Sequence, residues 1–409
     1  MIRSRLFAVI LTVCISALMT AACGGGGGGS SSSSTLFFVA TDDVRGFELW
    51  SYNASSDVTT LVVDHTPGGD SSTTWLTAVG NKLYYRANDG TGDHLWVLNT
   101  PSGAITCLTR NINPGSSPSV DELGAYNGKL YFKAEDPTIG EELWVTDGTA
   151  AGTTLVANQN PTGSFGQSNL AVYAGKLFMN GNGGGPEGPA LWSYNDSSEI
   201  LTLEADIIIS GATVYNGRLF FSADVDTRGR ELWAFDNAAG AATLVTDINT
   251  GPGDSRPGEL TVHDGVLYFS AADVTRGSEL WSYNASSEVT TLVADIWQAG
   301  TGSNPNHLTS LDGKLYFSAN NGFIGDELWS YDPLMDMAVP AYTFINGISS
   351  GSPAYLTVYD GDLYLQANDG IIGKELWAYD PDSGSATRIT DIFSGGGDSD
   401  VKDLTVVPE

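Results

Sequence analysis

The dipeptide Leu-Trp recurs eight times along this chain, and successive copies lie 41 to 48 residues apart. The eight tryptophans are Trp50, Trp96, Trp144, Trp192, Trp233, Trp281, Trp329 and Trp377. A period of this length is typical of repeat architectures, in which each copy buries its apolar surface only against its neighbours. The 409-residue chain is therefore expected to form one array, although its length would suit two or three ordinary domains.

Each copy contains four short segments rich in aliphatic and aromatic residues, separated by turn residues such as Gly, Asp and Pro. In the last copy these segments are 356–360, 363–367, 375–379 and 387–390. Such segments predict antiparallel strands. Four strands in a unit of about 40 to 50 residues predict one blade of a β-propeller.

The two ends of the chain predict how the ring closes. Eight second strands can be counted from Leu36 onward, and eight first strands from Leu76 onward. The chain opens on a second strand and ends on a first strand at 403–407, so the ends would complete one composite blade and leave no open sheet edge. We therefore predict an all-β fold over residues 35–409, an eight-bladed β-propeller of four-stranded antiparallel blades.

Successive apolar residues in the second strands, such as Leu219-Phe220-Phe221, indicate strands that are covered on both faces. Blades stacked face to face provide that cover. The repeated tryptophans are predicted to fill the space between neighbouring blades, because a large flat side chain buries much surface there. Stacking of these tryptophans against a ligand is the alternative.

Residues 1–22 have the layout of an export signal peptide, with a basic start, an apolar run from Leu6 to Met19 and small residues before Cys23. The apolar run is too short to span a membrane in the mature protein. Residues 23–34 continue as a Gly/Ser tether, a composition typical of flexible spacers.

The junction Thr20-Ala-Ala-Cys23 resembles the lipobox of bacterial lipoproteins, with Thr20 where an aliphatic residue is usual. The resemblance implies that Cys23 is lipidated and anchors the protein to a membrane. Because Gly24 and not aspartate follows the cysteine, it also implies the outer membrane, on the periplasmic side or the cell surface. Ordinary secretion is the alternative.

The third copy contains Glu-Leu-Trp-Val-Thr-Asp-Gly-Thr at 142–149, and this string resembles the bacterial ELWxxDGT repeat family. The resemblance covers residues 35–409 and implies propeller-like repeats with no defined activity. The last copy is also similar, from Ala367 to Trp377, to the tryptophan-docking motif of quinoprotein dehydrogenases, which are eight-bladed propellers with calcium and pyrroloquinoline quinone. The chain lacks the adjacent cysteine pair that those enzymes commonly place over the quinone.

The formal net charge of −30 disfavours nucleic acids and anionic lipids as partners. It favours metal cations, cationic proteins or neutral ligands such as glycans, and it also keeps an exported protein soluble. Of the three cysteines, only Cys107 lies beyond the leader and tether, so no disulfide framework is expected. We expect a monomer.

In a four-stranded meander, the loop between the second and third strands emerges on the same face as the loop that crosses to the next blade. Both loop types are rich in aspartate. Clustered carboxylates suit calcium, and the candidate ligands are Asp89, Asp136, Asp273 and Asp369. The alternative is that each aspartate caps its own tight turn.

Glutamate precedes Leu-Trp in six copies, as in Glu48 and Glu375, and we expect it to bond the loop above it. One segment, 180–211, departs from the repeat: its loop is glycine-rich, Ala190 replaces the glutamate and the next crossing loop is short. It is either a binding notch or decay of one copy. The four histidines fall in separate copies, and the residues show no catalytic constellation.

These observations favour a non-catalytic envelope lipoprotein whose propeller binds a protein or glycan partner at an acidic loop face, with calcium as a possible aid. The alternative is a propeller enzyme, a hydrolase, lyase or quinoprotein-like protein that acts in the central channel. Propeller folds host both classes of function, so the fold alone does not choose between them.

Overall fold

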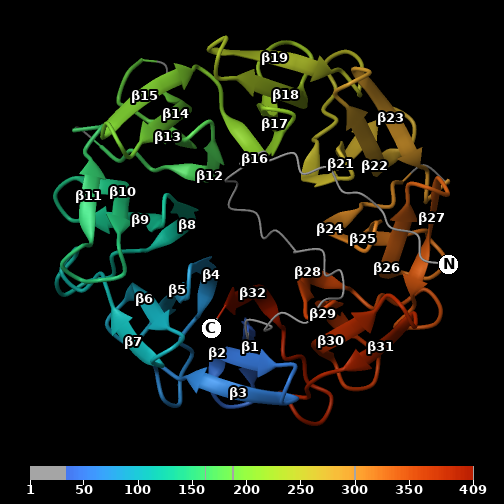
Figure 1. Ribbon diagram of the computed structural model, residues 1–409, viewed down its shortest axis with the longest axis horizontal. Helices are drawn as coiled ribbons and strands as arrows, with labels where there is room; N and C mark the ends of the chain where they lie inside the picture. The colour runs from blue at the N-terminus through green and yellow to red at the C-terminus, as the bar shows by residue number, and fades with distance from the viewer. Residues whose placement is uncertain (1–33, 162, 187, 299–300, 409) are drawn as a thin grey trace, which may run out of the picture.

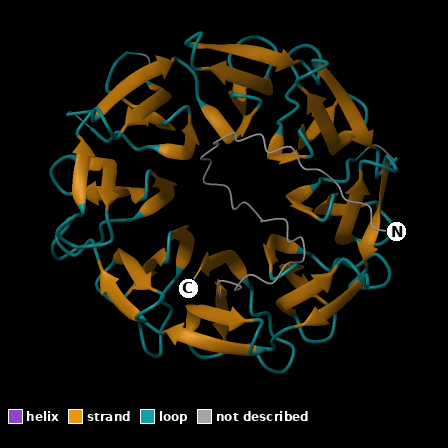
Figure 2. Cartoon of the chain, viewed as in Figure 1, coloured by secondary structure: helices purple, strands orange, loops and turns teal. Residues whose placement is uncertain are grey.

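The computed structural model describes residues 34–161, 163–186, 188–298 and 301–408. Eight four-stranded sheets stand around a common centre (Figure 1), and the described residues contain strands and loops without a helix (Figure 2). No described helix is therefore long and apolar enough to cross a membrane. The predicted eight-bladed propeller is confirmed.

Every blade runs outward from a first strand beside the central axis to a fourth strand at the outer edge of the disc (Figure 1). In the order of blades 1 to 8, the first strands are β32 (Lys402–Pro408), β4 (Thr74–Val79), β8 (Asp121–Tyr126), β12 (Ser168–Tyr173), β16 (Ile209–Tyr215), β20 (Gly258–His263), β24 (Asn306–Leu311) and β28 (Ala354–Tyr359). The second strands are β1 (Ser34–Asp42), β5 (Lys82–Asn88), β9 (Lys129–Asp136), β13 (Lys176–Asn182), β17 (Arg218–Asp224), β21 (Val266–Asp273), β25 (Lys314–Asn320) and β29 (Asp362–Asn368).

The outer half of each blade is a hairpin of a third and a fourth strand. The third strands are β2 (Gly46–Asn53), β6 (Asp93–Asn99), β10 (Gly140–Thr146), β14 (Pro189–Asn195), β18 (Arg230–Asp236), β22 (Gly277–Asn284), β26 (Asp326–Asp332) and β30 (Lys374–Asp380). The fourth strands are β3 (Val58–Val63), β7 (Ala104–Cys107), β11 (Thr154–Ala157), β15 (Ile200–Ala205), β19 (Ala241–Thr246), β23 (Val289–Ala294), β27 (Met337–Tyr342) and β31 (Ser385–Arg388).

The second strands are buried on both faces, as their unbroken apolar runs predict. In β17, Leu219 and Phe221 pack against blade 4, whereas Phe220 packs against Phe269 of blade 6. None of these three side chains is more than 1 % exposed. Each blade thus supplies half of two apolar cores, and burial of these side chains contributes stability only when both neighbours are present.

The repeated tryptophans lie in these layers between blades. Trp233 belongs to the cluster between blades 4 and 5, and Trp377 to the cluster between blades 7 and 8. The indole N–H groups of Trp50, Trp96 and Trp144 donate to backbone carbonyls of their own blades. These contacts are those of core residues.

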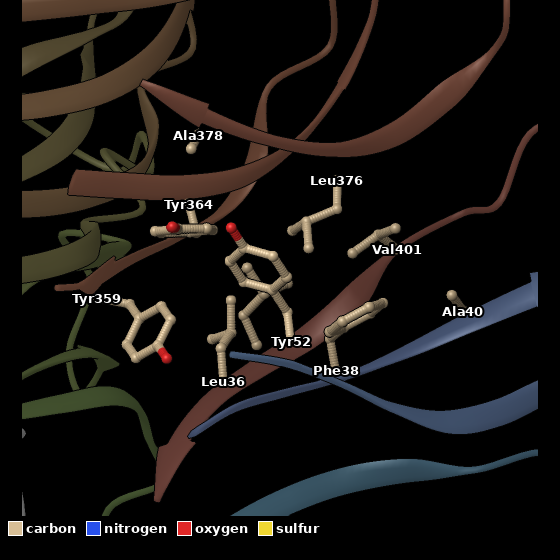
Figure 3. Close-up of a cluster of buried hydrophobic side chains, with 10 residues drawn as sticks. Leu36, Phe38, Ala40, Tyr52, Tyr359, Tyr364, Leu376, Ala378 and Val401 are labelled. Carbon is tan, nitrogen blue, oxygen red and sulfur yellow. The ribbon is translucent and has the colours of Figure 1, made fainter. Parts of the chain in front are cut away.

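The ring closes through a composite blade, as predicted. β1 pairs with β32 in an antiparallel ladder that includes Leu36 opposite Val406. β1 begins at Ser34, one residue before the predicted start of the domain. At the seam, Leu36 and Phe38 of blade 1 pack against Tyr364 of blade 8 (Figure 3).

Tyrosines at the ends of four first strands clamp neighbouring blades together. Tyr173 donates from its hydroxyl to the carbonyl of Gly217 at 2.8 Å and accepts from the amide of Asn237 at 3.1 Å. The other three clamps are Tyr126, Tyr215 and Tyr359. Each hydroxyl therefore uses both its donor and its acceptor capacity between two blades.

Removal of residues 400–409 deletes β32, so β1 loses its ladder partner and the ring opens beside blade 8. We expect the melting temperature to fall by more than about 10 °C, measured by circular dichroism. Val407→Asp is a milder test, because it introduces a charge at a side chain that is 0 % exposed. Leu334→Gln, in a turn and 95 % exposed, is the control and should leave the melting temperature unchanged. A truncated chain that melts like the intact one would contradict ring closure by β32.

Candidate functional site

One face of the disc, here called the loop face, carries the loops between second and third strands together with the loops that cross between blades. The two loop types touch: Asp70 of the first crossing loop accepts a hydrogen bond from the amide of Phe47 at 2.9 Å. Between them lies Gly46, whose φ is +75° and whose added Cβ would stand 2.5 Å from Asp70. The predicted parity of these loops is confirmed.

The glutamate of the Glu-Leu-Trp string holds the crossing loop in place, as expected. In blade 6, Glu279 accepts hydrogen bonds from the amides of Ile296 at 3.0 Å and Ser303 at 3.0 Å, and from the Ser303 hydroxyl at 2.5 Å. Six such glutamates are 0 % exposed: Glu48, Glu142, Glu231, Glu279, Glu327 and Glu375. Their contacts are structural, because none of these side chains is open to a ligand.

Burial raises the pKa of these glutamates above its usual value. The pKa of Glu48 rises to about 7, and so does that of Glu375. Hydrogen bonds from Ser71 and Ser399, respectively, act in the opposite direction but do not outweigh the loss of hydration.

The divergent segment 180–211 is anchored by a different residue. Asn180 both donates to the carbonyl and accepts from the amide of Ile209, each at 2.9 Å, and so replaces the glutamate that blade 4 lacks. Gly183 lies against Trp192, where an added Cβ would stand 2.5 Å from the indole ring. The glycine-rich loop thus covers the repeated tryptophan of its own blade.

The four candidate calcium ligands lie in four separate blades. Each carboxylate caps its own loop, as when Asp369 accepts from the amides of Ile371 at 2.9 Å and Ile372 at 3.0 Å. Asp89 and Asp273 also form ion pairs, with Arg110 and Arg276 respectively. Asp136 accepts from the amide of Thr138 at 2.8 Å. The described part of the chain has no group of three or more acidic, histidine or cysteine side chains suited to a metal, and calcium binding stays a prediction.

The mouth of the central channel on the loop face carries residues that sequence reasoning did not single out. Each first strand contains a β-bulge with one residue in the left-handed region, at φ between +54° and +62°. We call these eight residues the rim: Trp75, Glu122, Asn169, Gly211, Glu259, His307, Tyr355 and Asp403. They occupy the same position in all eight blades, yet only glutamate occurs twice.

Rim residues contact their neighbours around the axis. Asp403 accepts from the amide of Trp75 at 2.8 Å, and Glu259 accepts from the amide of His307 at 2.7 Å. The rings of His307 and Tyr355 lie 5.4 Å apart between centroids. Burial raises the pKa of Tyr355 and lowers that of His307.

Below the rim, threonine hydroxyls link the first strands of successive blades. Five threonines donate to the leucine carbonyl of the next blade: Thr213, Thr261, Thr309, Thr357 and Thr405. In blades 3 and 4 the same position holds Gly124 and Ala171, which have no hydroxyl. A cavity of about 510 Å³ lies along this part of the channel, with Leu76, Leu123 and Leu170 in its wall.

The rim positions could have been found in the sequence, because each of them directly precedes the apolar residue of its first strand. Trp75 and Glu122, for example, stand before Leu76 and Leu123. In a regular strand, successive side chains point to opposite faces of the sheet, so the sequence alone does not place this residue at the end of the channel. The bulge interrupts this alternation at the start of each first strand.

Comparisons with known proteins support the fold alone. No family model matches the chain, and no curated protein sequence matches it, so the resemblance to the ELWxxDGT repeats stays a prediction. A solved structure of dihydro-heme d1 dehydrogenase NirN in complex with DHE aligns with a TM-score of 0.57 and 10 % identity, over 86 % of this chain and 72 % of that one.

Two further solved structures are longer than this protein. One comes from a study of two prolyl endopeptidases, with a TM-score of 0.51, 9 % identity and coverage of 82 % of this chain and 50 % of that one. The other is puromycin hydrolase, with a TM-score of 0.50, 16 % identity and coverage of 80 % and 55 %. The chain therefore spans about half the length of these two proteins.

The buried glutamates generate a prediction about pH. Because their pKa is higher in the folded chain than the usual 4.5, the stability linked to them is full below about pH 4.5 and is lost as the pH rises through about 7. Denaturant titrations should therefore show a lower free energy of unfolding at pH 8 than at pH 5.5.

Two matched variants test the assignment. Glu48 accepts from the amide of Ser71 through Oε1, while its buried Oε2 has no partner, so Glu48→Gln should keep the fold and flatten part of the pH dependence. In Glu279 both carboxylate oxygens accept hydrogen bonds from backbone amides. In Glu279→Gln one of these oxygens becomes an NH₂ group that faces an N–H donor, which should lower the free energy of unfolding by about 1–3 kcal/mol. Equal losses in both variants would contradict this account.

Proposed function

We propose that this protein is a non-catalytic binding propeller of the cell envelope. Its partner, a protein or a glycan, binds at the channel mouth on the loop face. Residues 1–22 serve as its signal peptide, and a lipid on Cys23 anchors it to the outer membrane. These segments lie outside the described residues, and the support for them is the layout of the leader. The net charge of −30 argues against nucleic acid as the partner.

The rim is the observation that carries the proposal. The structural positions near the rim carry the same residue type in most blades, as the buried glutamates, the packed tryptophans and the channel threonines do. At the rim, by contrast, aromatic, acidic, amide and imidazole side chains stand together around one opening. Trp75 and Tyr355 are each 36 % exposed there. Varied polar groups beside exposed aromatic rings are typical of a ligand site.

A photo-crosslinking residue at Tyr355 should capture the partner in native envelopes, because this rim residue is 36 % exposed. The measurement is mass spectrometry of the crosslinked product, for peptides and for sugars. The same residue at Asp382, in an exposed turn of the opposite face, is the control and should capture nothing specific. A Cys23→Ala chain, made with the Tyr355 probe, should leave the membrane fraction. Capture from Asp382 alone would contradict binding at the rim.

An enzyme is the second candidate, and one observation favours it. Glu259, His307 and Tyr355 stand on three successive blades at the rim, with the contacts given above. A carboxylate, an imidazole and a phenol are groups that transfer protons in hydrolases and lyases. The solved structures named above come from enzymes, but at 9 to 16 % identity they support only the shared fold.

If the rim is catalytic, His307→Ala should lower kcat by about 100-fold or more on whichever polymeric substrate the intact chain cleaves. The assay is release of reducing ends or peptides from envelope polymers. His65→Ala, which alters a histidine on the loop face away from the axis, is the control. A purified chain that releases no product would remove the enzyme candidate.

A further inference from the structure

We infer that Trp75 is the stacking platform for a neutral sugar ring, and that the channel cavity between blades 2 and 5 receives the adjoining part of a glycan. This inference rests on the proposed function and narrows its partner to an uncharged oligosaccharide.

Trp75 is held in one orientation by carboxylates from the two neighbouring blades. Asp403 of blade 1 accepts from the backbone amide of Trp75 at 2.8 Å, and from the hydroxyl of Thr74 at 2.7 Å. Asp121 of blade 3 accepts from the indole N–H at 3.0 Å. Unlike the repeated tryptophans, this indole is exposed and stands outside the cores between blades. An aromatic ring fixed in advance loses little conformational freedom when a ligand binds.

The polar groups beside the indole match the hydroxyl groups of a sugar. Arg86 donates to Asp121 at 2.5 Å, and Lys133 lies 4.0 Å from the same carboxylate and 3.9 Å from Glu141. Donors and acceptors therefore alternate within one ion-paired network. A sugar hydroxyl both donates and accepts, whereas an apolar peptide side chain would strip water from these groups without replacing its hydrogen bonds.

The charges near Trp75 favour a neutral ligand. Two cations, Arg86 and Lys133, face Asp121 and Glu141 as ion-pair partners, and Glu122 and Asp403 add two further carboxylates at the rim. An acidic glycan would meet excess negative charge here and on the protein as a whole. The apolar C–H face of a neutral sugar, in contrast, can lie flat against the indole ring.

The cavity begins directly after Trp75 in the chain, at Leu76. Its wall is mostly aliphatic, because Gly124 and Ala171 stand where other blades have threonine, and the hydroxyl groups of Thr77, Thr213 and Thr405 also line it. At Gly124 an added Cβ would stand 2.8 Å from the side chain of Leu170, which would have to move to make room for it. A volume of about 510 Å³ lies within the range of small-ligand sites, so a second or third sugar unit can follow the stacked one.

The test is isothermal titration calorimetry of the full chain with neutral hexasaccharides of β-1,4-glucose, α-1,4-glucose, β-1,3-glucose and N-acetylglucosamine. We expect at least one to bind, and Trp75→Ala to weaken it by about tenfold or more, with Trp75→Tyr in between. Phe323→Ala removes an aromatic ring that is 78 % exposed at a loop tip of blade 7. It is the matched control and should bind as the wild type does. Unchanged melting temperatures would show that all variants are folded.

Three results would overturn the inference. Undiminished sugar binding by Trp75→Ala would show that the indole of Trp75 does not stack against the sugar. Binding of oligogalacturonate or oligolysine in place of the neutral sugars would show that the site selects a charged ligand. If no sugar binds while the Tyr355 crosslink captures a protein, the glycan inference fails and the proposed function stands. If the crosslink also captures nothing, the proposed function fails with it.

Discussion

The ladder between β1 and β32 is the constraint on which the rest of the structure depends. No blade has a core of its own, because each second strand divides its apolar side chains between two neighbours. An open row of blades would leave two such faces in water, together with unpaired strand edges. Pairing of the chain ends removes both defects at once.

Closure is reinforced at both faces of the disc by repeated hydrogen bonds. On the loop face, buried glutamates such as Glu279 bind the amides of the crossing loops. On the opposite face, tyrosines such as Tyr173 join the turns of neighbouring blades. Because these contacts and the cores between blades hold the ring, the rim is left free to vary. This separation places the chemically diverse residues around one opening.

Much of the fold was predictable, because the signals repeat. The Leu-Trp period, the strand count and the unpaired first strand at 403–407 together predict eight blades and their closure, and repetition of Glu48 and its equivalents indicates a structural role. The candidate site was harder to predict from the sequence. Trp75 occurs once at the rim position and glutamate only twice, so repetition draws little attention to them. The substitution of Asn180 for a glutamate on another strand joins residues that no spacing rule connects.

The sequence by itself determined the number of blades, the strand order within them and the way the ring closes. These properties depend on local patterns of apolar and turn residues, which the chain carries eight times. Only the tertiary structure decided which side chains meet at the axis. A bulge at the start of each first strand interrupts the alternation of its side chains at the channel mouth. The partners of the bulged residue come from other blades, so the contacts exist only when the ring is complete.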